Sequence, residues 1–290
     1  MAYASFDDLL RAASEHGSLG RAALALEVAE TGSDATALRA RMRESLGVMR
    51  EAVGTGLSSN ARSRSGFVGG DASKVASSQA GPLGGTFADV IAAALATGEV
   101  NAAMGRIVAA PTGGASGVLP AVLLAIGAQH GASEEELTEA LFAAAGIGGV
   151  IAARATLSGA AGGCQAEIGS AAAMAAAAAV ELVGGSPEQA GHAASLALQG
   201  QMGLVCDPVA GLVEVPCVFR NATGAAVALS AVEMALAGVE FPIPFDEVVD
   251  AMGLVGRSLP PTLRETALGG LATTPCGREM SRGVTGETRP

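Results

Sequence analysis

Apolar residues recur along this chain at the three- and four-residue intervals of an α-helix. One helix is predicted to begin near Asp34 and to end near Gly54. Its apolar face comprises Leu38, Met42, Leu46, Met49 and Val53. Alternating apolar and polar residues, which would indicate strands, are almost absent. The pattern predicts an all-α, compact multi-helix domain over residues 1–290, with an amphipathic helical segment at 1–56.

Two helix starts have the spacing of a capping box. Ser133 is followed by Glu136, and Ser186 by Gln189. In this pattern each side chain satisfies the backbone N–H of the other residue. Pro187 also suits the first helical position. We expect helices to begin at both sites, and neither signal indicates a function.

Two glycine-rich segments interrupt the helical pattern and are predicted to be active-site loops. Residues 58–85 contain the sequence SGFVGGD, whose glycines allow backbone amides to approach a ligand closely. Residues 110–117 precede an apolar helix expected from about 118 to 128. Free N–H groups there would suit a carboxylate, although a turn that only caps the helix would look the same. No lysine follows the glycines of residues 110–117, which excludes a common type of phosphate-binding loop there.

The charge and hydropathy of the chain narrow the possible partners. The formal net charge is −11, with one lysine, Lys74, and no basic cluster among aromatic residues, so nucleic-acid binding is not expected.

The first residues do not resemble a secretory signal, and we expect a cytoplasmic protein. Residues 107–133 lack Asp, Glu, Lys and Arg, but only 121–128 are continuously apolar. That is short of the roughly 20 residues of a membrane span and predicts a core helix.

Three cysteines, Cys164, Cys206 and Cys217, each lie beside glycine or proline and a polar residue. In a cytoplasmic chain they argue against a disulfide scaffold and leave metal binding, catalysis or simple burial open. Their spacing matches no common zinc or ferredoxin motif. A cysteine at a glycine-led helix start is stabilised as the metal-binding thiolate. Three thiolates would leave one iron of a four-iron cluster open as a Lewis acid.

The residues around these cysteines resemble the α chain of iron–sulfur-dependent L-serine dehydratase, also called L-serine ammonia-lyase. The runs that carry the resemblance are GGCQAEIGSAAAMAAAA (162–178) and GLVCDPVAGLVEVPCVFRNATG (203–224). Further similar runs are SGFVGGDASK (65–74), EVNAAMGRIVAAPTGGASGVLP (99–120) and LRETALGGLATTP (263–275). The resemblance implies an all-helical catalytic domain that converts L-serine to pyruvate and ammonia without pyridoxal phosphate. It also implies an oxygen-sensitive [4Fe–4S] cluster bound by Cys164, Cys206 and Cys217.

In this family the serine hydroxyl would bind the open iron and leave as water after removal of the α-proton. The resulting aminoacrylate tautomerises and hydrolyses. The base is open between Lys74, Asp71, Glu167, His192 and a partner residue. Substrate binding is expected at Ser65, Gly70, Thr112, Gly113, Ser116, Arg220 and Asn221. Arg220 could instead form a structural salt bridge with Glu214.

Some family members also contain a small regulatory-type β domain, which is fused or forms a separate chain. Because this sequence lacks it, we expect a separate β chain as partner. Some relatives place a C-terminal cysteine on the open iron, but Cys276 lies further from the end, and we expect an idle thiol before a flexible tail at 277–290. Three alternatives stay open: a related cysteine-desulfidating enzyme, a pyridoxal phosphate enzyme that uses Lys74, and a non-catalytic helical subunit that binds an anion or a partner protein.

Overall fold

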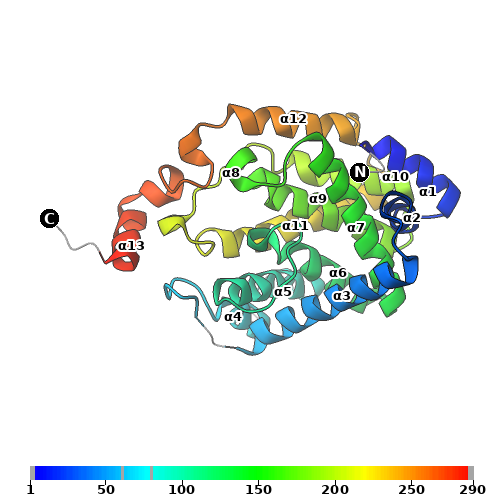
Figure 1. The fold of residues 1–290 in the computed structure, drawn as a ribbon. Helices are drawn as coiled ribbons and strands as arrows, with labels where there is room; N and C mark the ends of the chain where they lie inside the picture. Colours follow the sequence, from blue (N-terminus) through cyan, green and yellow to red (C-terminus); the bar gives the residue numbers. More distant parts are fainter. Residues whose placement is uncertain (1–3, 60–61, 79–80, 287–290) are drawn as a thin grey trace.

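The computed structural model describes residues 4–59, 62–78 and 81–286. Within these ranges the chain is helical, without strands, which confirms the predicted all-α class (Figure 1). The longer helices are α1 (Phe6–His16), α2 (Leu19–Thr31), α3 (Ala35–Ser58), α5 (Gly85–Ala102), α6 (Val118–His130), α7 (Glu134–Arg154), α9 (Ile168–Leu182), α10 (Pro187–Gln199), α11 (Cys217–Leu236), α12 (Phe245–Ser258) and α13 (Pro275–Thr285). Shorter elements are α4 (Asp71–Ser77), α8 (Gly159–Gly162), η1 (Gly113–Ala115), η2 (Cys164–Ala166), η3 (Val209–Gly211), η4 (Pro261–Leu263) and η5 (Gly270–Thr273).

Helix α9 forms the centre of the domain. Every residue from Ile168 to Val180 is buried, and α6, α7, α10 and α11 pack around it. Most of these residues are alanines, whose small side chains let the neighbouring helices approach closely. Close approach also occurs between α3 and α5, where a Cβ atom on Gly56 would lie 2.3 Å from the carbonyl oxygen of Ala96. The core therefore depends on small residues more than on aromatic rings.

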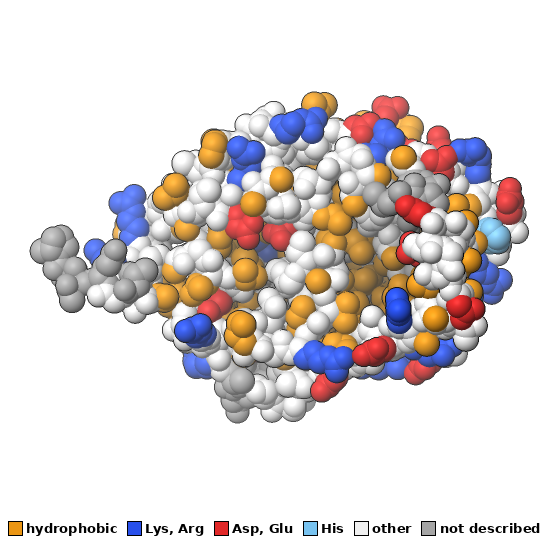
Figure 2. Space-filling model, viewed as in Figure 1, with side chains coloured by type: hydrophobic (Ala, Val, Ile, Leu, Met, Phe, Trp, Pro, Cys, Tyr) orange, Lys and Arg blue, Asp and Glu red, His pale blue; other side chains and the backbone are white. Residues whose placement is uncertain are grey.

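The remaining helices cover this centre. Helix α1 packs on α2, α2 on α7, and α3 on α5, so the segment expected to be helical at 1–56 forms three separate helices. Helix α12 contacts α10, and α13 lies at the opposite end of the molecule from α1 (Figure 1). On the face shown in Figure 2, Lys and Arg side chains are interspersed with Asp and Glu, and hydrophobic side chains lie in the hollows between helices.

The local helix signals agree well with the structure. The carboxylate of Asp34 accepts a hydrogen bond from Ala37 N at 2.8 Å, and both predicted capping boxes are formed at Ser133 and Ser186. Helix α3 ends at Ser58, four residues later than predicted, because packing of Gly56 on α5 outweighs the weak helix propensity of its glycines.

Two expectations about irregular segments differ from the structure. The segment 58–85 was expected to be a loop, but it contains the short helix α4. The carboxylate of Glu99, on α5, accepts backbone N–H groups of Gly70, Asp71 and Ala72 and thereby caps that helix. In the predicted flexible tail at 277–290, helix α13 continues to Thr285, and residues 287–290 lie outside the described part.

Helix α7 is long and apolar enough to cross a membrane by length and composition. However, 67% of its most apolar window is buried inside the protein, as expected for a core helix. Helix α6, in the uncharged stretch at 107–133, has 13 residues and is largely buried, which confirms its prediction as a core helix.

Candidate active site

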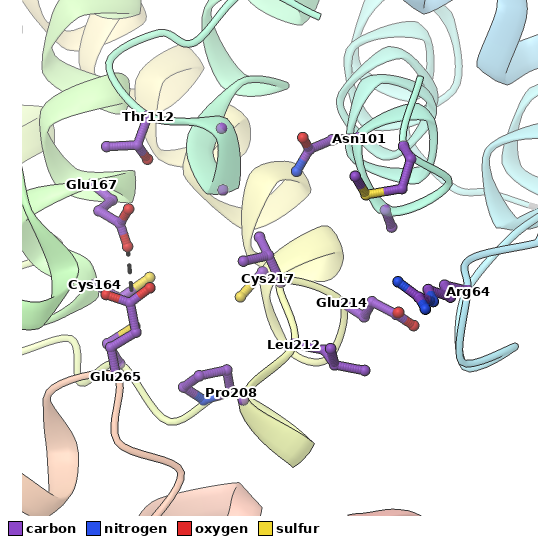
Figure 3. Close-up of a pocket in the computed structure, with 17 residues that line it drawn as sticks. Arg64, Asn101, Thr112, Cys164, Glu167, Pro208, Leu212, Glu214, Cys217 and Glu265 are labelled. Carbon is purple, nitrogen blue, oxygen red and sulfur yellow. Dashed lines mark hydrogen bonds between the residues drawn. The ribbon is translucent and has the colours of Figure 1, made fainter. Parts of the chain in front are cut away.

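A cavity of about 530 Å³ opens where the loops before α6, α9 and α11 meet. Its walls come from five segments that are distant in the sequence: the turn around Arg64, the end of α5, the turn at η1, the start of α9 and the loop that leads to Cys217. Glu265, from the segment after α12, completes the wall. Figure 3 shows these side chains around the cavity.

The three cysteines converge on this cavity. Cys164 begins η2, Cys206 lies in the loop before η3, and Cys217 is the first residue of α11. All three are buried, with at most 8% of the residue exposed. The sulfur atoms of Cys164 and Cys206 and a carboxylate oxygen of Glu167 lie within 4.8 Å of one another. Cys217 lines the same cavity, whereas Cys276 is exposed on α13.

The three thiols differ in their tendency to ionise. The pKa of Cys164 is lowered, first by a hydrogen bond from Cys206 and then by the positive charge of Arg220. The pKa of Cys206 is raised by its role as donor in that bond and by burial. Burial and the nearby Cys164 raise the pKa of Cys217 to about 12. These shifts favour ionisation of Cys164 over that of Cys206 and Cys217, and a metal ion in the cavity would favour the ionised form of all three.

This donor set fits an iron–sulfur cluster. Thiolates are the ligands that such clusters use, and three of them face one cavity in a chain where these cysteines form no disulfide. Gly159 leaves room beside these groups, because a Cβ atom there would lie 2.4 Å from Glu167 Oε2 and 3.3 Å from Cys206 Sγ. The residues present therefore match the group that the sequence resemblance implies.

The segment 263–271 holds the Cys206 loop in place. Cys206 N donates to Leu263 O at 2.9 Å, and Glu265 N donates to Cys206 O at 2.7 Å. The next residue, Asp207, accepts a hydrogen bond from Leu271 N at 2.7 Å. Gly270 has a φ of +59°, and a Cβ atom there would lie 2.2 Å from Asp207 Oδ2. Only glycine fits at this contact.

Glu167 is the carboxylate that groups with Cys164 and Cys206. It lies between η2 and α9, and its Oε2 is 4.0 Å from Cys206 Sγ. Burial is the main reason that its pKa is raised, while the Thr112 hydroxyl opposes this shift and Glu265 adds to it. Thr112 Oγ1 is buried and makes no hydrogen bond of regular geometry. The carboxylate therefore accepts a proton more readily than an exposed glutamate does.

Only some of the residues expected to bind substrate reach the cavity. Thr112 and Gly113 line it. Ser116 is fully buried, and its hydroxyl donates to Gly113 O at 2.7 Å. Asn221 is also buried, where its amide accepts from Gly117 N and donates to the carbonyls of Gly114 and Cys217. Ser116 and Asn221 thus shape the η1 turn from behind.

Arg220 does not line the cavity, and its guanidinium is already engaged. It donates to Val205 O and to Asp207 Oδ1, both at 2.8 Å. The alternative considered for Arg220, a structural salt bridge with Glu214, is not formed, and Arg220 pairs with Asp207 instead. Glu214 instead accepts hydrogen bonds from the hydroxyl groups of Ser63 and Ser65.

The remaining sequence candidates lie outside the cavity. Lys74 pairs with Asp71 at 2.6 Å on α4, and 74% of the lysine side chain is exposed. The N–H of Gly70 is bound to Glu99. His192, on α10, accepts a hydrogen bond from Phe241 N at 3.2 Å, and it does not line the cavity. Among the four candidate bases of this chain, Glu167 is the one at the cavity wall.

Sequence reasoning missed three polar residues of the cavity wall, Arg64, Asn101 and Glu265. Each lies in or next to a run that carries the family resemblance. No helical spacing or metal-ligand spacing marks them, so only their position within those runs could have indicated a role. Met104, Ala210, Glu265 and Ala267 have positive φ angles, and these strained residues lie in the segments that form the wall.

Comparison with known proteins gives matches to serine dehydratase alpha chains, in agreement with the sequence resemblance. Residues 14–272 match the family model of the serine dehydratase alpha chain. The chain is 50% identical over 252 residues to a probable L-serine dehydratase alpha chain of Bacillus subtilis, covering 85% of this chain and 83% of the relative. It is 53% identical over 200 residues to the L-serine dehydratase alpha chain of Peptoniphilus asaccharolyticus, covering 69% and 68%.

A third relative is the L-serine dehydratase of Streptomyces coelicolor, which is 38% identical over 277 residues. The match covers 92% of this chain but 60% of that relative. These matches confirm the resemblance that the runs around the cysteines indicated. The chain belongs to the serine dehydratase alpha-chain family.

Proposed function

We propose that this chain is the catalytic α subunit of an enzyme that converts L-serine to pyruvate and ammonia. The observation that carries the proposal is the convergence of three buried cysteines and Glu167 on one cavity. The names of the relatives, L-serine dehydratases, support the choice of substrate. A non-catalytic helical subunit would have no need to bring several ionisable groups together in a buried site.

Cys164, Cys206 and Cys217 would hold a [4Fe–4S] cluster. Support comes from the donor set and from the nearby Arg220, whose positive charge favours ionised sulfur. When bound, the cluster would supply a Lewis-acidic iron that assists the departure of the substrate hydroxyl. Glu167 is close enough to Cys206 to lie beside the cluster.

Glu167 is the proposed base for the α-proton. Its carboxylate oxygen would take the proton from Cα of L-serine as the Cα–H electron pair forms the Cα=Cβ double bond and the bond between Cβ and the hydroxyl oxygen breaks. The departing hydroxide and the proton removed from Cα together make up the water that is lost. The product is an aminoacrylate, which tautomerises to an imine and hydrolyses to pyruvate and ammonia. Burial raises the pKa of Glu167, and a base whose pKa is closer to neutral holds the abstracted proton better.

Pyridoxal phosphate chemistry finds no support in this arrangement. It would need Lys74, the single lysine of the sequence, as the Schiff base. That side chain is exposed, paired with Asp71 and outside the cavity. The cysteine-desulfidating alternative shares the cluster and is separated from the proposal by its preferred substrate.

A separate β chain is the proposed partner. Two relatives are named alpha chains, and the Streptomyces coelicolor relative is longer than the part that matches this chain. The active enzyme would then form only after the two chains associate.

The decisive test is an anaerobic preparation with its β chain, reconstituted with iron and sulfide. We expect bound iron, acid-labile sulfide and pyruvate formation from L-serine. Cys206→Ala should lose both iron and activity, whereas the matched control Cys276→Ala should keep both. Activity in colourless, iron-free protein would refute the cluster, and faster sulfide release from L-cysteine would assign the desulfidating reaction instead.

A further inference from the structure

The cavity wall is rich in carboxylates. Glu167, Glu214 and Glu265 line it, and within the described residues Arg64 is the basic side chain that does so. An amino-acid substrate brings a further carboxylate into this acidic surrounding, and binding it requires a positive charge. Arg220, the residue expected to serve, is held by Asp207 and Val205.

Arg64 lies in a tight turn with a defined shape. Gly66 N donates to Ser63 O, and Ser63 N donates to Val68 O, both at 2.9 Å. Gly66 has a φ of +79°, which the turn requires. The neighbouring Arg62 donates to Gly66 O at 3.1 Å, whereas the Arg64 guanidinium has no hydrogen bond or ion pair with any described residue. Arg64 thus presents free donors at the cavity.

A buried carboxylate fixes this turn to the cysteine loop. Glu214, with 4% of the residue exposed, accepts hydrogen bonds from the hydroxyls of Ser63 (2.5 Å) and Ser65. Ser65 N also donates to Glu214 Oε1 at 3.4 Å. Since Glu214 lies three residues before Cys217, these contacts set the position of Arg64 relative to that cysteine.

The two sides of the cavity have different chemistry. In Figure 3, Glu167 and Thr112 lie on one side, Arg64 and Glu214 lie on the other, and Cys217 lies between them. A small amino acid placed over Cys217 would have a proton acceptor on one side and a guanidinium on the other. Arginine suits this task because its planar group binds both oxygens of a carboxylate at once.

We propose that Arg64 binds the carboxylate of the amino-acid substrate and that Glu214 positions it through Ser63 and Ser65. The inference rests on the proposed function, because it requires an amino acid in this cavity. It replaces Arg220 as the carboxylate-binding residue and makes a free carboxylate a requirement for good substrates.

The test compares Arg64→Gln and Arg64→Lys with Arg106→Gln in the reconstituted enzyme with its β chain. Arg106 is a matched control because it is an exposed arginine that does not line the cavity and takes no part in the turn of Arg64. Losing a charge-assisted hydrogen bond should raise KM for L-serine about 10- to 100-fold in Arg64→Gln, with a smaller rise in Arg64→Lys. Iron content and Tm should stay at the wild-type values, and Arg106→Gln should leave KM unchanged.

Chemical rescue separates binding from a structural effect. Added guanidinium ion should restore part of the activity of Arg64→Ala but none of that lost in Arg220→Ala. The double variant Ser63→Ala/Ser65→Ala should raise KM more than it lowers kcat, as expected for positioning residues.

A KM in Arg64→Gln within twofold of the wild type, or an equal rise in Arg106→Gln, would overturn the inference while the proposed function stands. Wild-type enzyme that forms no pyruvate from L-serine would instead refute the proposed function.

Discussion

Replacing Asp207 by alanine tests the link between the cysteine loop and the rest of the site. The Asp207 side chain is 3% exposed and accepts hydrogen bonds from Arg220 and from Leu271 N. In Asp207→Ala the Arg220 guanidinium, whose side chain is 14% exposed, loses its carboxylate partner, and Leu271 N–H loses its acceptor. Removing one partner of a buried ion pair costs about 3 to 5 kcal/mol in free energy of unfolding.

For a protein of this size, each kcal/mol changes Tm by roughly 2 °C, so Asp207→Ala should lower the Tm of the apoprotein by at least about 6 °C. Asp207→Asn keeps an acceptor for Leu271 N–H, so its Tm should lie between those of Asp207→Ala and the wild type. Glu44→Ala, which removes an exposed pair with Arg106 at 3.3 Å, is the control and should leave Tm almost unchanged.

Calorimetry of the three variants measures these shifts, and iron content after reconstitution gives a second measurement. Because Arg220 lowers the pKa of Cys164, a displaced guanidinium should also weaken cluster binding in Asp207→Ala. Asp207→Ala with the Tm of Glu44→Ala and full iron content would refute the reasoning that Asp207 holds the site together.

Three further predictions concern separate parts of the molecule. Burial raises the pKa of the Glu181 carboxyl from 4.5 to about 7, so the folded protein binds a proton there more tightly than the unfolded chain does. The free energy of unfolding should therefore fall by up to about 3 kcal/mol as the pH rises from 4.5 to 7. When the free energy of unfolding is measured with urea at several pH values, Glu181→Gln should show a smaller decline with pH than the wild type. An equal decline in both proteins would contradict the assignment of this pH dependence to Glu181. Glu167→Gln should lower kcat about 10²- to 10⁴-fold with iron retained, and a near-normal kcat would exclude it as the base. Gly270→Ala should displace the 263–271 segment and reduce iron content, whereas Gly283→Ala, with open space around it, should not; equal iron in both would count against the contact with Asp207.

Local features of this protein follow from residues close together in the sequence. The capping boxes at Ser133 and Ser186 formed as predicted because each depends on side chains within four positions. The core helix α6 and the all-α class follow from apolar spacing, which needs no knowledge of neighbours. Helix ends were less certain, and α3 extends past Gly54 because its last turn packs on α5.

In the candidate site, too, some features follow from the sequence and others only from the tertiary structure. The sequence determined which residue types are available: cysteines beside turns, glycine-rich segments and an acidic residue after Cys164. It could not show which polar groups remain free to bind a substrate. The N–H of Gly70 is satisfied by Glu99, and Asn221 by the η1 turn, through hydrogen bonds that join distant segments.

Arg220 and Arg64 show why the sequence alone could not identify the residue that is free to bind an anion. From the sequence, Arg220 is the natural anion-binding residue because it follows Cys217 by three positions. In the folded protein Asp207 pairs with Arg220. Glu214 accepts hydrogen bonds from Ser63 and Ser65, and the Arg64 guanidinium stays available at the cavity wall. Residue type and helical character are properties of short stretches of sequence. The partner that a charged group finds depends on which segments the tertiary fold brings within hydrogen-bonding distance, and only the structure decided that.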